Sequence, residues 1–295
     1  MQKNAIIIVP VYKDFSELNE LERISLKQLY QVLAKHPICL IGPSNFNWKL
    51  YLIDAANRNV CPAIKEFKFD YFKNISGYNK LLQSTTFFKE FKKYKYLLLY
   101  QLDAYVFREE LAYWCNQGYD YIGAPWTGFK NYKNKPLTGV GNGGFSLRNV
   151  RKSLQLLRTL RFFEVLYSYR FLNNKSIILR LPIILKKLMK AHKFESKFEK
   201  EYRYFEDIFW CKGVEERLNS TDFNSSILKL TVRLFVRYDF KIPPVEIASR
   251  FSIEAEPKKY YELNNWELPF GCHAWEKYEP EFWKEFIQAI RTARF

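Results

Sequence analysis

The sequence lacks the uninterrupted apolar run of roughly 18 residues that a membrane-spanning helix requires. Its apolar residues 5–9 are too few for the core of a signal peptide, and they lead to Pro10 and charged residues instead of a cleavage site. Cysteine is scarce, and its five residues form no CxxC pair, which argues against a zinc knuckle or a disulfide framework. A GxxxxGKS/T phosphate-binding loop is also absent. We therefore expect a cytosolic protein with reduced cysteines.

Apolar and basic residues dominate the composition. Hydrophobic residues make up 48% and aromatic residues 18% of the 295 positions, which excludes a disordered chain and allows one large domain or two small ones. The net charge of +16 calls for an anionic partner. Residues 151–200 hold 13 Lys and Arg against three acids, so the positive charge is concentrated in one part of the chain.

Basic and apolar residues are mixed from about 162 to 200, most densely in residues 175–193. One interpretation is a basic helical excursion whose lysines face water. The other is an interfacial segment that is attracted to an anionic membrane surface while its Leu and Ile side chains enter the headgroup boundary. Nucleic acid is not an expected partner, because no recognised nucleic-acid-binding module is visible.

Short apolar strands alternate with amphipathic helices along much of the chain. Strands are predicted at 5–11, 38–41, 65–70, 94–102 and 119–126, and helices at 15–35, 50–57, 81–91, 151–161 and 280–294. Strand–helix–strand repetition in this order predicts an α/β fold with a mostly parallel central sheet flanked by helices.

The apolar run at 94–102 ends at Asp103. A run without alternation is typical of a strand that is buried on both faces. A carboxylate is costly to bury unpaired, so Asp103 is expected at the strand end with a partner. There it would bind a metal or a ligand, since ligands bind at the carboxyl ends of strands in open α/β sheets. The alternative is a cap for the helix predicted from Glu109 to Asn116.

A glycine cluster, Gly139-Val-Gly-Asn-Gly-Gly144, precedes Phe145-Ser-Leu-Arg148. It does not open a helix straight after the first strand, which argues against a Rossmann dinucleotide site. Glycine permits positive φ and a close approach of the backbone to a ligand. One interpretation is therefore a ligand-facing strand with Asn142, Ser146 and Arg148, and the other is a tight hairpin or bulge.

Two later segments carry the remaining polar candidates. Glu206 and Asp207 begin an aromatic-rich helix. The helix dipole favours acids at that position, and near a reaction centre one of them would serve as a general base. His273 lies between a Gly-Cys turn and Trp275, where a lone histidine is either structural or a ligand.

A series of motifs resembles GT-A-fold glycosyltransferases, and more closely an uncharacterised glycosyltransferase-like family of bacterial surface-polysaccharide loci. The motifs are Tyr100-Gln-Leu-Asp103-Ala, Tyr121-Ile-Gly-Ala-Pro-Trp126, Gly139-Val-Gly-Asn-Gly-Gly-Phe-Ser-Leu-Arg148, Glu206-Asp-Ile-Phe-Trp210 and Pro269-Phe-Gly-Cys-His-Ala-Trp275. The resemblance spans about residues 5–280 and is weakest over the basic stretch. It implies a single GT-A-like (Rossmann-like) domain, with a nucleotide-sugar-binding half at 1–126 and an acceptor half at 127–295.

The resemblance also implies a nucleotide-sugar donor, in the first instance a UDP-sugar, and a divalent metal, Mn²⁺ or Mg²⁺. In such enzymes a DxD motif at a strand end holds the metal against the diphosphate, whereas here Gln101 replaces the first acid. Asp103 and His273 are the implied metal ligands, and imidazole suits Mn²⁺ better than Mg²⁺. Gln101 is expected to contact the ribose or a metal-bound water.

The same resemblance implies which residues act as the general base and which contact the donor and the acceptor. Asp207, with Glu206 second, is the implied general base of an inverting transfer. The resemblance implies further contacts with the donor from Val9, Pro10, Tyr12 and Arg148. It also implies that the acceptor and sugar pocket is lined by Trp126, Asn142, Gly143, Gly144 and Trp275. A tryptophan such as Trp126 either stacks on a sugar face or belongs to the core.

These inferences predict a metal-dependent glycosyltransferase that extends a lipopolysaccharide or capsule glycan, on a glycan or lipid-linked acceptor, at the cytosolic face of the bacterial inner membrane. One alternative is a catalytically silent relative that only binds carbohydrate or nucleotide sugar, which the missing first acid favours. Another is a nucleotidyltransferase, although the chain lacks a glycine- and lysine-rich phosphate loop after its first strand.

Overall fold

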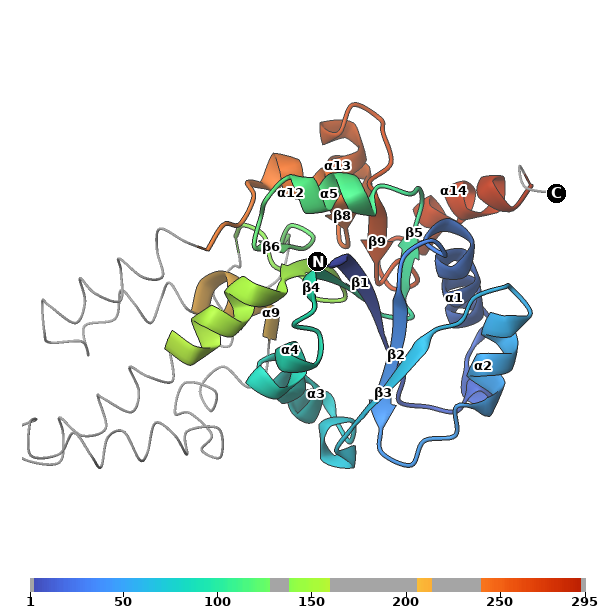
Figure 1. Cartoon of the computed structure of the whole chain (residues 1–295). Coiled ribbons are helices and arrows are strands. Elements are labelled where there is room, and N and C mark those ends of the chain that lie inside the picture. The colour runs from blue at the N-terminus through green and yellow to red at the C-terminus, as the bar shows by residue number, and fades with distance from the viewer. Residues whose placement is uncertain (1–2, 128–137, 160–205, 214–239, 293–295) are drawn as a thin grey trace, which may run out of the picture.

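The computed structural model of the chain describes residues 3–127, 138–159, 206–213 and 240–292 (Figure 1). Within these residues the central sheet has the strand order β3-β2-β1-β4-β7-β6. The strands are β1 (Lys3–Pro10), β2 (Ile38–Pro43), β3 (Ala63–Phe67), β4 (Tyr94–Tyr100), β6 (Tyr121–Ile122) and β7 (Phe145–Asn149). The first four pair in parallel, and β7 runs antiparallel to both β4 and β6. The expected α/β fold with a mostly parallel sheet is confirmed.

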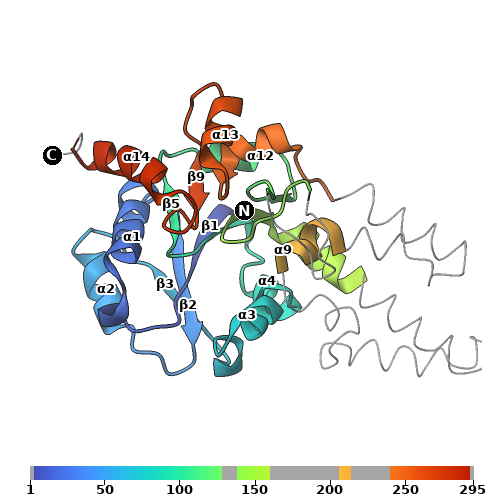
Figure 2. The same ribbon diagram turned by 180° about the vertical axis from the view of Figure 1, so that it is seen from behind.

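Helices cover both faces of this sheet. The helices α1 (Glu20–Val32) and α2 (Lys49–Ala56) lie on one face, and α3 (Ile75–Leu82), α4 (Thr85–Glu90) and the helical residues 150–159 lie on the other (Figures 1 and 2). Alternate residues of the strands enter two separate apolar clusters, so that Ile7 and Leu98 pack toward α1 while Ile8 and Leu97 pack toward α3 and α4. This confirms the prediction that the apolar run before Asp103 is a strand buried on both faces.

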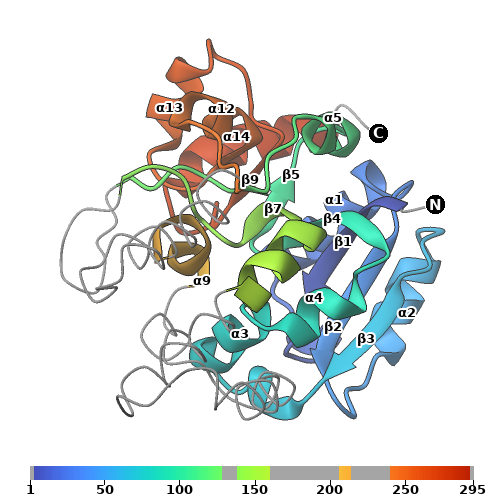
Figure 3. The same ribbon diagram turned by 60° about the vertical axis from the view of Figure 1, so that its left-hand side comes forward.

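A second, smaller sheet lies beyond the end of β4. It contains β5 (Ala104–Val106), β9 (Gly271–His273) and β8 (Ser252–Ile253), with β9 between the other two. Around it lie α5 (Leu111–Asn116), α12 (Val245–Phe251), α13 (Pro257–Leu263) and α14 (Pro280–Thr292), as Figure 3 shows. Because β5 follows Asp103 directly, this sheet brings the late part of the chain to the end of β4.

Two predicted helices have different bounds in the structure. The helix expected at 15–35 becomes a 3-10 turn (Phe15–Glu17) followed by α1, because Asn19 caps α1: its Oδ1 accepts from Glu22 N at 2.8 Å and Glu22 reaches back to Asn19 N. The helix expected at 81–91 is divided between α3 and α4, because the Ser84 hydroxyl accepts from Phe87 N and starts a new helix.

The segment predicted as a strand at 119–126 forms only the two-residue β6. Pro125 has no N–H to donate, and it makes an isolated bridge with Val140. A 3-10 turn (Phe69–Tyr71), α9 (Glu206–Ile208) and a π-helical turn (Phe209–Gly213) complete the described elements. The basic stretch at 162–200 lies outside the described residues. No helix in the described ranges is long and apolar enough to cross a membrane.

Candidate functional site

A pocket of about 440 Å³ lies where the chain changes direction in the sheet. From β1 the chain moves outward through β2 and β3 and then returns to the other side of β1 as β4, so β1 and β4 form the topological switch point at which ligands bind in such sheets. The pocket is lined at this point by Pro10 and Tyr12 after β1, by Gln101 and Asp103 after β4, and by Ile75 and Tyr78 of α3. The first four were sequence candidates. Val9 instead packs in the core.

Asp103 occupies a turn between two strands of different sheets. Gln101 N donates to Gly144 O and Ala104 N donates to Gln101 O, both at 2.9 Å, and β5 begins at once. The helix α5 begins only at Leu111, with Glu110 at its cap position. The interpretation of Asp103 as a helix cap is therefore wrong, because β5 separates it from the helix.

His273 reaches Asp103 through the pairing of β5 with β9. Ala104 is the antiparallel partner of His273, so the imidazole lies beside the residue that precedes Ala104. Its Nε2 atom is 3.2 Å from Asp103 Oδ1 and 3.2 Å from Gln101 Oε1. The amide nitrogen of Gln101 donates to Tyr78 Oη at 3.2 Å, which holds the amide with its oxygen toward the histidine.

A second carboxylate lies behind the imidazole. Glu254 Oε1 is 3.4 Å from His273 Nδ1, and both residues are buried. Burial by itself would lower the pKa of His273, but the Asp103 and Glu254 carboxylates outweigh it and raise the pKa well above its usual value. Burial likewise would raise the pKa of Asp103, and the imidazolium outweighs it and lowers the pKa.

Two glycines of the cluster are required by close contacts. A Cβ on Gly143 would overlap Glu206 Oε1, and a Cβ on Gly144 would overlap the imidazole of His273. Asn142 is buried, and its Oδ1 accepts from Gly144 N at 3.2 Å. These two glycines, which lie just before β7, thus let the backbone pass between Glu206 and His273.

Arg148 and Glu206 form a buried ion pair. Arg148 Nη1 lies 2.8 Å from Glu206 Oε2 and Nη2 lies 2.7 Å from Oε1, so the two groups meet in a bidentate arrangement. Burial would lower the pKa of the guanidinium, but Glu206 outweighs it and raises the pKa above its usual value. The structure places Arg148 inside the protein against Glu206, and Arg148 does not line the pocket at the strand ends.

Asp207 is held by Trp126 and by its own helix. Trp126 Nε1 donates to Asp207 Oδ2 at 3.2 Å, and Ile208 N donates to Oδ1 at 2.9 Å. Burial, with a further contribution from the charges of Glu206 and Glu254, raises the pKa of Asp207 to about 6. A carboxylate with a pKa near neutrality suits proton transfer at physiological pH.

The two tryptophans among the candidates are both buried. Trp126 is 5% exposed and holds Asp207, whereas Trp275 is 2% exposed and packs edge-on against Tyr105 in the core of the small sheet. Trp275 therefore offers no free face for sugar stacking in this structure. Sequence reasoning missed Glu254, although it follows strand β8 as Asp103 follows β4, and an acid at a strand end was the signal used for Asp103.

The residues at the strand ends fit the divalent metal that the resemblance implies. Gln101 Oε1, Asp103 Oδ1 and His273 Nε2 converge, and oxygen together with imidazole suits Mn²⁺. Metal-ligating histidines usually direct their second nitrogen to a carboxylate, as His273 does toward Glu254. No three His, Cys, Asp or Glu side chains form a metal-binding group in the described ranges, and the third polar atom at this point is the amide oxygen of Gln101.

The fold and these residues define an α/β protein with a polar site at the switch point of its sheet. The chain belongs to the family described as "Protein of unknown function (DUF5672)", whose model matches residues 62–273. A search of curated proteins found no significant match.

Several solved structures show a distant similarity. The glycosyltransferase GlyE from Streptococcus pneumoniae TIGR4, in its apo form, has a TM-score of 0.43 and 11% identity, covering 97% of this chain and 60% of that one. The mannosyltransferase Ktr4p from S. cerevisiae with GDP has a TM-score of 0.39 and 8% identity, covering 51% of this chain and 58% of that one. TarS 1-349 from S. aureus with UDP-GlcNAc has a TM-score of 0.31 and 11% identity, covering 50% of this chain and 46% of that one. Similarity this low does not assign a reaction to the chain, which spans about three fifths of the length of the first two.

Proposed function

We propose that this protein is a glycosyltransferase that moves a sugar from a nucleotide-sugar donor, first of all a UDP-sugar, to a hydroxyl of a lipopolysaccharide or capsule glycan. The observation that carries the proposal is the convergence of His273 with Asp103 and Gln101, two residues that line the switch-point pocket. It is supported by the Asp207 carboxylate, whose pKa is raised to about 6 by burial and by the charges of Glu206 and Glu254, the latter 3.4 Å from His273 Nδ1. Diphosphate binding and acceptor activation require these two kinds of group.

In this proposal the pocket at the strand ends holds the donor. Pro10 and Tyr12 line it from the first strand, in the half at 1–126 that we assign to the nucleotide sugar. Asp103, His273 and the amide of Gln101 would hold Mn²⁺ or Mg²⁺, which would neutralise charge on the leaving nucleoside diphosphate. Residues 127–295 would then form the acceptor half.

Asp207 is the proposed general base. Its carboxylate would take the proton from the acceptor hydroxyl as the hydroxyl oxygen attacks the anomeric carbon, which gives inversion. Glu206 is the second choice, because it is held in a buried bidentate ion pair with the Arg148 guanidinium, whereas Asp207 has no cationic partner among the described residues. We assign Arg148 and Trp126 the role of holding the acidic pair in place.

A donor panel tests this function. Purified protein is incubated with UDP-sugars and Mn²⁺, and release of UDP is measured with and without candidate acceptor glycans. We expect one donor to be turned over, with activity abolished in Asp103→Ala. Activity should fall about 10²- to 10⁴-fold in Asp207→Asn. The matched control is Asp54→Asn, which alters a half-buried pair between Asp54 of α2 and Arg58 outside the pocket and should leave turnover unchanged.

One observation favours a second candidate, a silent relative that binds nucleotide sugar without turning it over. In the described ranges no three His, Cys, Asp or Glu side chains form a metal-binding group, and Gln101 replaces an acid beside Asp103 and His273. Donor binding without turnover, unaffected by Asp207→Asn, would establish this candidate. Release of pyrophosphate from a nucleoside triphosphate would instead indicate a nucleotidyltransferase.

We further propose that residues 175–193 attract the protein to the cytosolic face of the bacterial inner membrane. This segment lies outside the described residues, and the proposal depends on its sequence alone. Binding to vesicles that contain anionic lipid should weaken as salt is raised. Equal retention of a variant that lacks residues 175–193 would exclude this role.

A further inference from the structure

The described part of the chain has a second cavity, of about 470 Å³, between α4 and the helical residues 150–159. Lys89 and Lys92 line it from the end of α4, and Arg151 and Arg158 line it from the helix. All four side chains are exposed. Buried Val150 and Leu154 also line it, so the cavity has an apolar base and a cationic rim.

The four cations have no counter-charge in the described ranges. None of them forms an ion pair with a described residue, and the nearest acid in sequence, Glu90, is 2.6 Å from Lys65. Arg151 and Arg158 are seven residues apart on one helix and therefore project from the same face. Four like charges around one cavity repel each other, and a bound anion relieves that repulsion.

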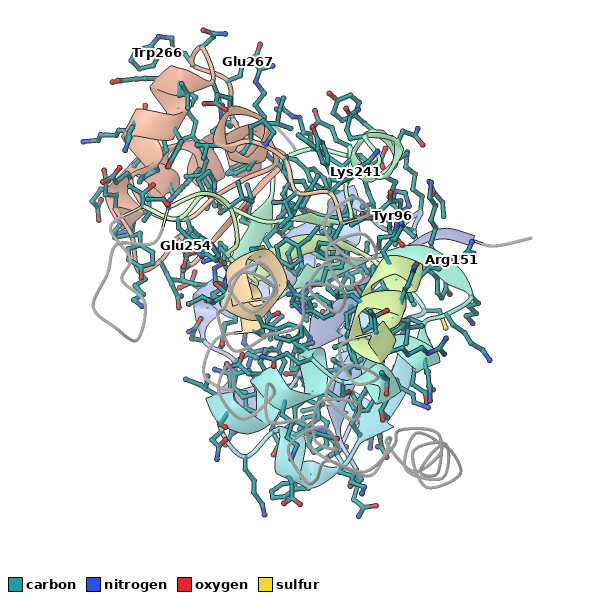
Figure 4. All side chains as sticks on the ribbon, turned by 90° about the vertical axis from the view of Figure 1, so that its left-hand side faces the viewer. Tyr96, Arg151, Lys241, Glu254, Trp266 and Glu267 are labelled. Atoms are coloured by element: carbon teal, nitrogen blue, oxygen red, sulfur yellow. The ribbon has the colours of Figure 1, made fainter. Side chains whose placement is uncertain are left out.

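This cavity is separate from the site at Asp103. The chain enters β4 from α4, and Asn149, which immediately precedes the helix, pairs with Tyr96 near the start of β4. Asp103 follows the other end of the same strand, and seven residues at about 3.3 Å each put roughly 20 Å between the two ends. Figure 4 shows Arg151 and Glu254 on opposite sides of α9.

We propose that the cavity lined by Lys89, Lys92, Arg151 and Arg158 binds a phosphate group. Arginine offers a planar fork of donors that matches phosphate, and lysine adds compact charge from the facing element. The phosphate would come from an anionic lipid headgroup or from a soluble phosphate compound. The site goes beyond the proposed transferase activity, because it needs neither the donor pocket nor turnover.

The test compares full-length wild type with Arg151→Gln/Arg158→Gln. The control, Lys49→Gln/Lys258→Gln, removes the same charge from exposed positions on α2 and α13, outside the cavity. Inorganic pyrophosphate is titrated by calorimetry, and vesicles of phosphatidylcholine with or without phosphatidylglycerol are tested by co-sedimentation. Each Lys or Arg close to an anionic membrane surface strengthens binding to it, and the cavity variant lacks two of them. It should therefore bind phosphatidylglycerol vesicles about 30-fold more weakly than wild type, and the control should lose much less affinity. Pyrophosphate affinity should fall at least tenfold in the cavity variant.

The two probes distinguish the sources of the phosphate. A selective loss with vesicles alone identifies a lipid headgroup, and a selective loss with pyrophosphate alone identifies a soluble phosphate. A selective loss with both shows a phosphate site open to either source. Equal binding of both probes by the cavity variant and the control overturns the proposal. All substituted residues are exposed, so unchanged melting temperatures should confirm that each variant is folded.

Discussion

Substitution of Asp207 by Asn should raise stability and remove activity in the same protein. Burial raises the pKa of Asp207 to about 6 from 3.8, so the ionised form is less favourable in the folded chain than in the unfolded chain. The substitution removes that charge and keeps the shape of the side chain. Asn still accepts from Ile208 N, but its amide nitrogen cannot accept from Trp126 Nε1, so one hydrogen bond is lost.

The expected magnitude follows from these two effects. A pKa difference of about two units corresponds to about 3 kcal/mol at a pH well above both values. A lost hydrogen bond costs about 1 kcal/mol, which leaves a net gain of about 2 kcal/mol above pH 7. The pKa of Asp207 is higher in the folded chain than in the unfolded chain. Its contribution to the stability of wild type is therefore fully present below pH 4 and is lost as the pH rises through 6. Below pH 4 the variant should therefore be the less stable protein.

Thermal unfolding from pH 4 to 8 measures this difference. At pH 8 we expect the melting temperature of Asp207→Asn to exceed that of wild type by about 4 °C, with the difference falling to zero or reversing near pH 4. Asp54→Asn should follow wild type within about 2 °C at each pH, because a partly exposed ion pair such as Asp54–Arg58 contributes about 1 kcal/mol or less. A variant that is destabilised equally at pH 5 and pH 8 would refute the raised pKa. Full transferase activity in Asp207→Asn would refute its role as base.

Four further outcomes concern neighbouring contacts. Arg148→Met should lower the free energy of unfolding by about 3–5 kcal/mol in urea titrations, because it leaves Glu206 buried without its partner. A loss of less than about 1 kcal/mol would contradict the importance of this ion pair. Glu254→Ala should weaken Mn²⁺ binding about 10- to 100-fold by calorimetry. Glu254→Gln still offers His273 an oxygen and should lose less Mn²⁺ affinity. Equal losses of affinity in the two variants would show that Glu254 does not orient His273. Gly144→Ala should also weaken Mn²⁺ binding, because its Cβ overlaps the imidazole, and unchanged affinity would show that the close approach is unnecessary. UDP should bind at least tenfold more weakly in EDTA than in Mn²⁺, and equal affinities would exclude a metal at the donor pocket.

The central sheet was predictable from the sequence because each strand is a local signal. An apolar run of strand length with no alternation occurs at β1, β2 and β4, and burial on both faces demands that pattern. The ends of the helices were harder to predict from the sequence. A single capping side chain, such as Asn19 or Ser84, decides where a helix begins by accepting from a free backbone N–H. The two-residue β6 carries too little pattern to set its bounds.

The sequence offered several of the residues that meet at the strand ends, but not their arrangement. Asp103 and His273 are 170 positions apart, and only the antiparallel pairing of β5 with β9 brings them together. Each of these strands has three residues, which is too short for a periodic signal. The role of Gly143 and Gly144 was equally hidden, because it depends on Glu206 and His273 arriving from distant segments.

Acidic side chains outnumber basic ones among the described residues that line the switch-point pocket, although the chain as a whole is basic. Glu22, Asp103 and Glu276 line it together with Lys73. Three of these four charges are already paired, because Glu22 is 2.7 Å from Lys13, Asp103 is 3.2 Å from His273, and Lys73 is 2.6 Å from Asp70. Glu276 forms no ion pair with a described residue, so a diphosphate in this pocket would be repelled by that carboxylate, and a bound cation would offset the repulsion. The cavity at Lys89 and its neighbours has the reverse composition and can hold a phosphate with its own side chains. Chelation of the metal should therefore separate the two sites, because it removes nucleotide from the pocket and leaves phosphate binding at the basic cavity unchanged.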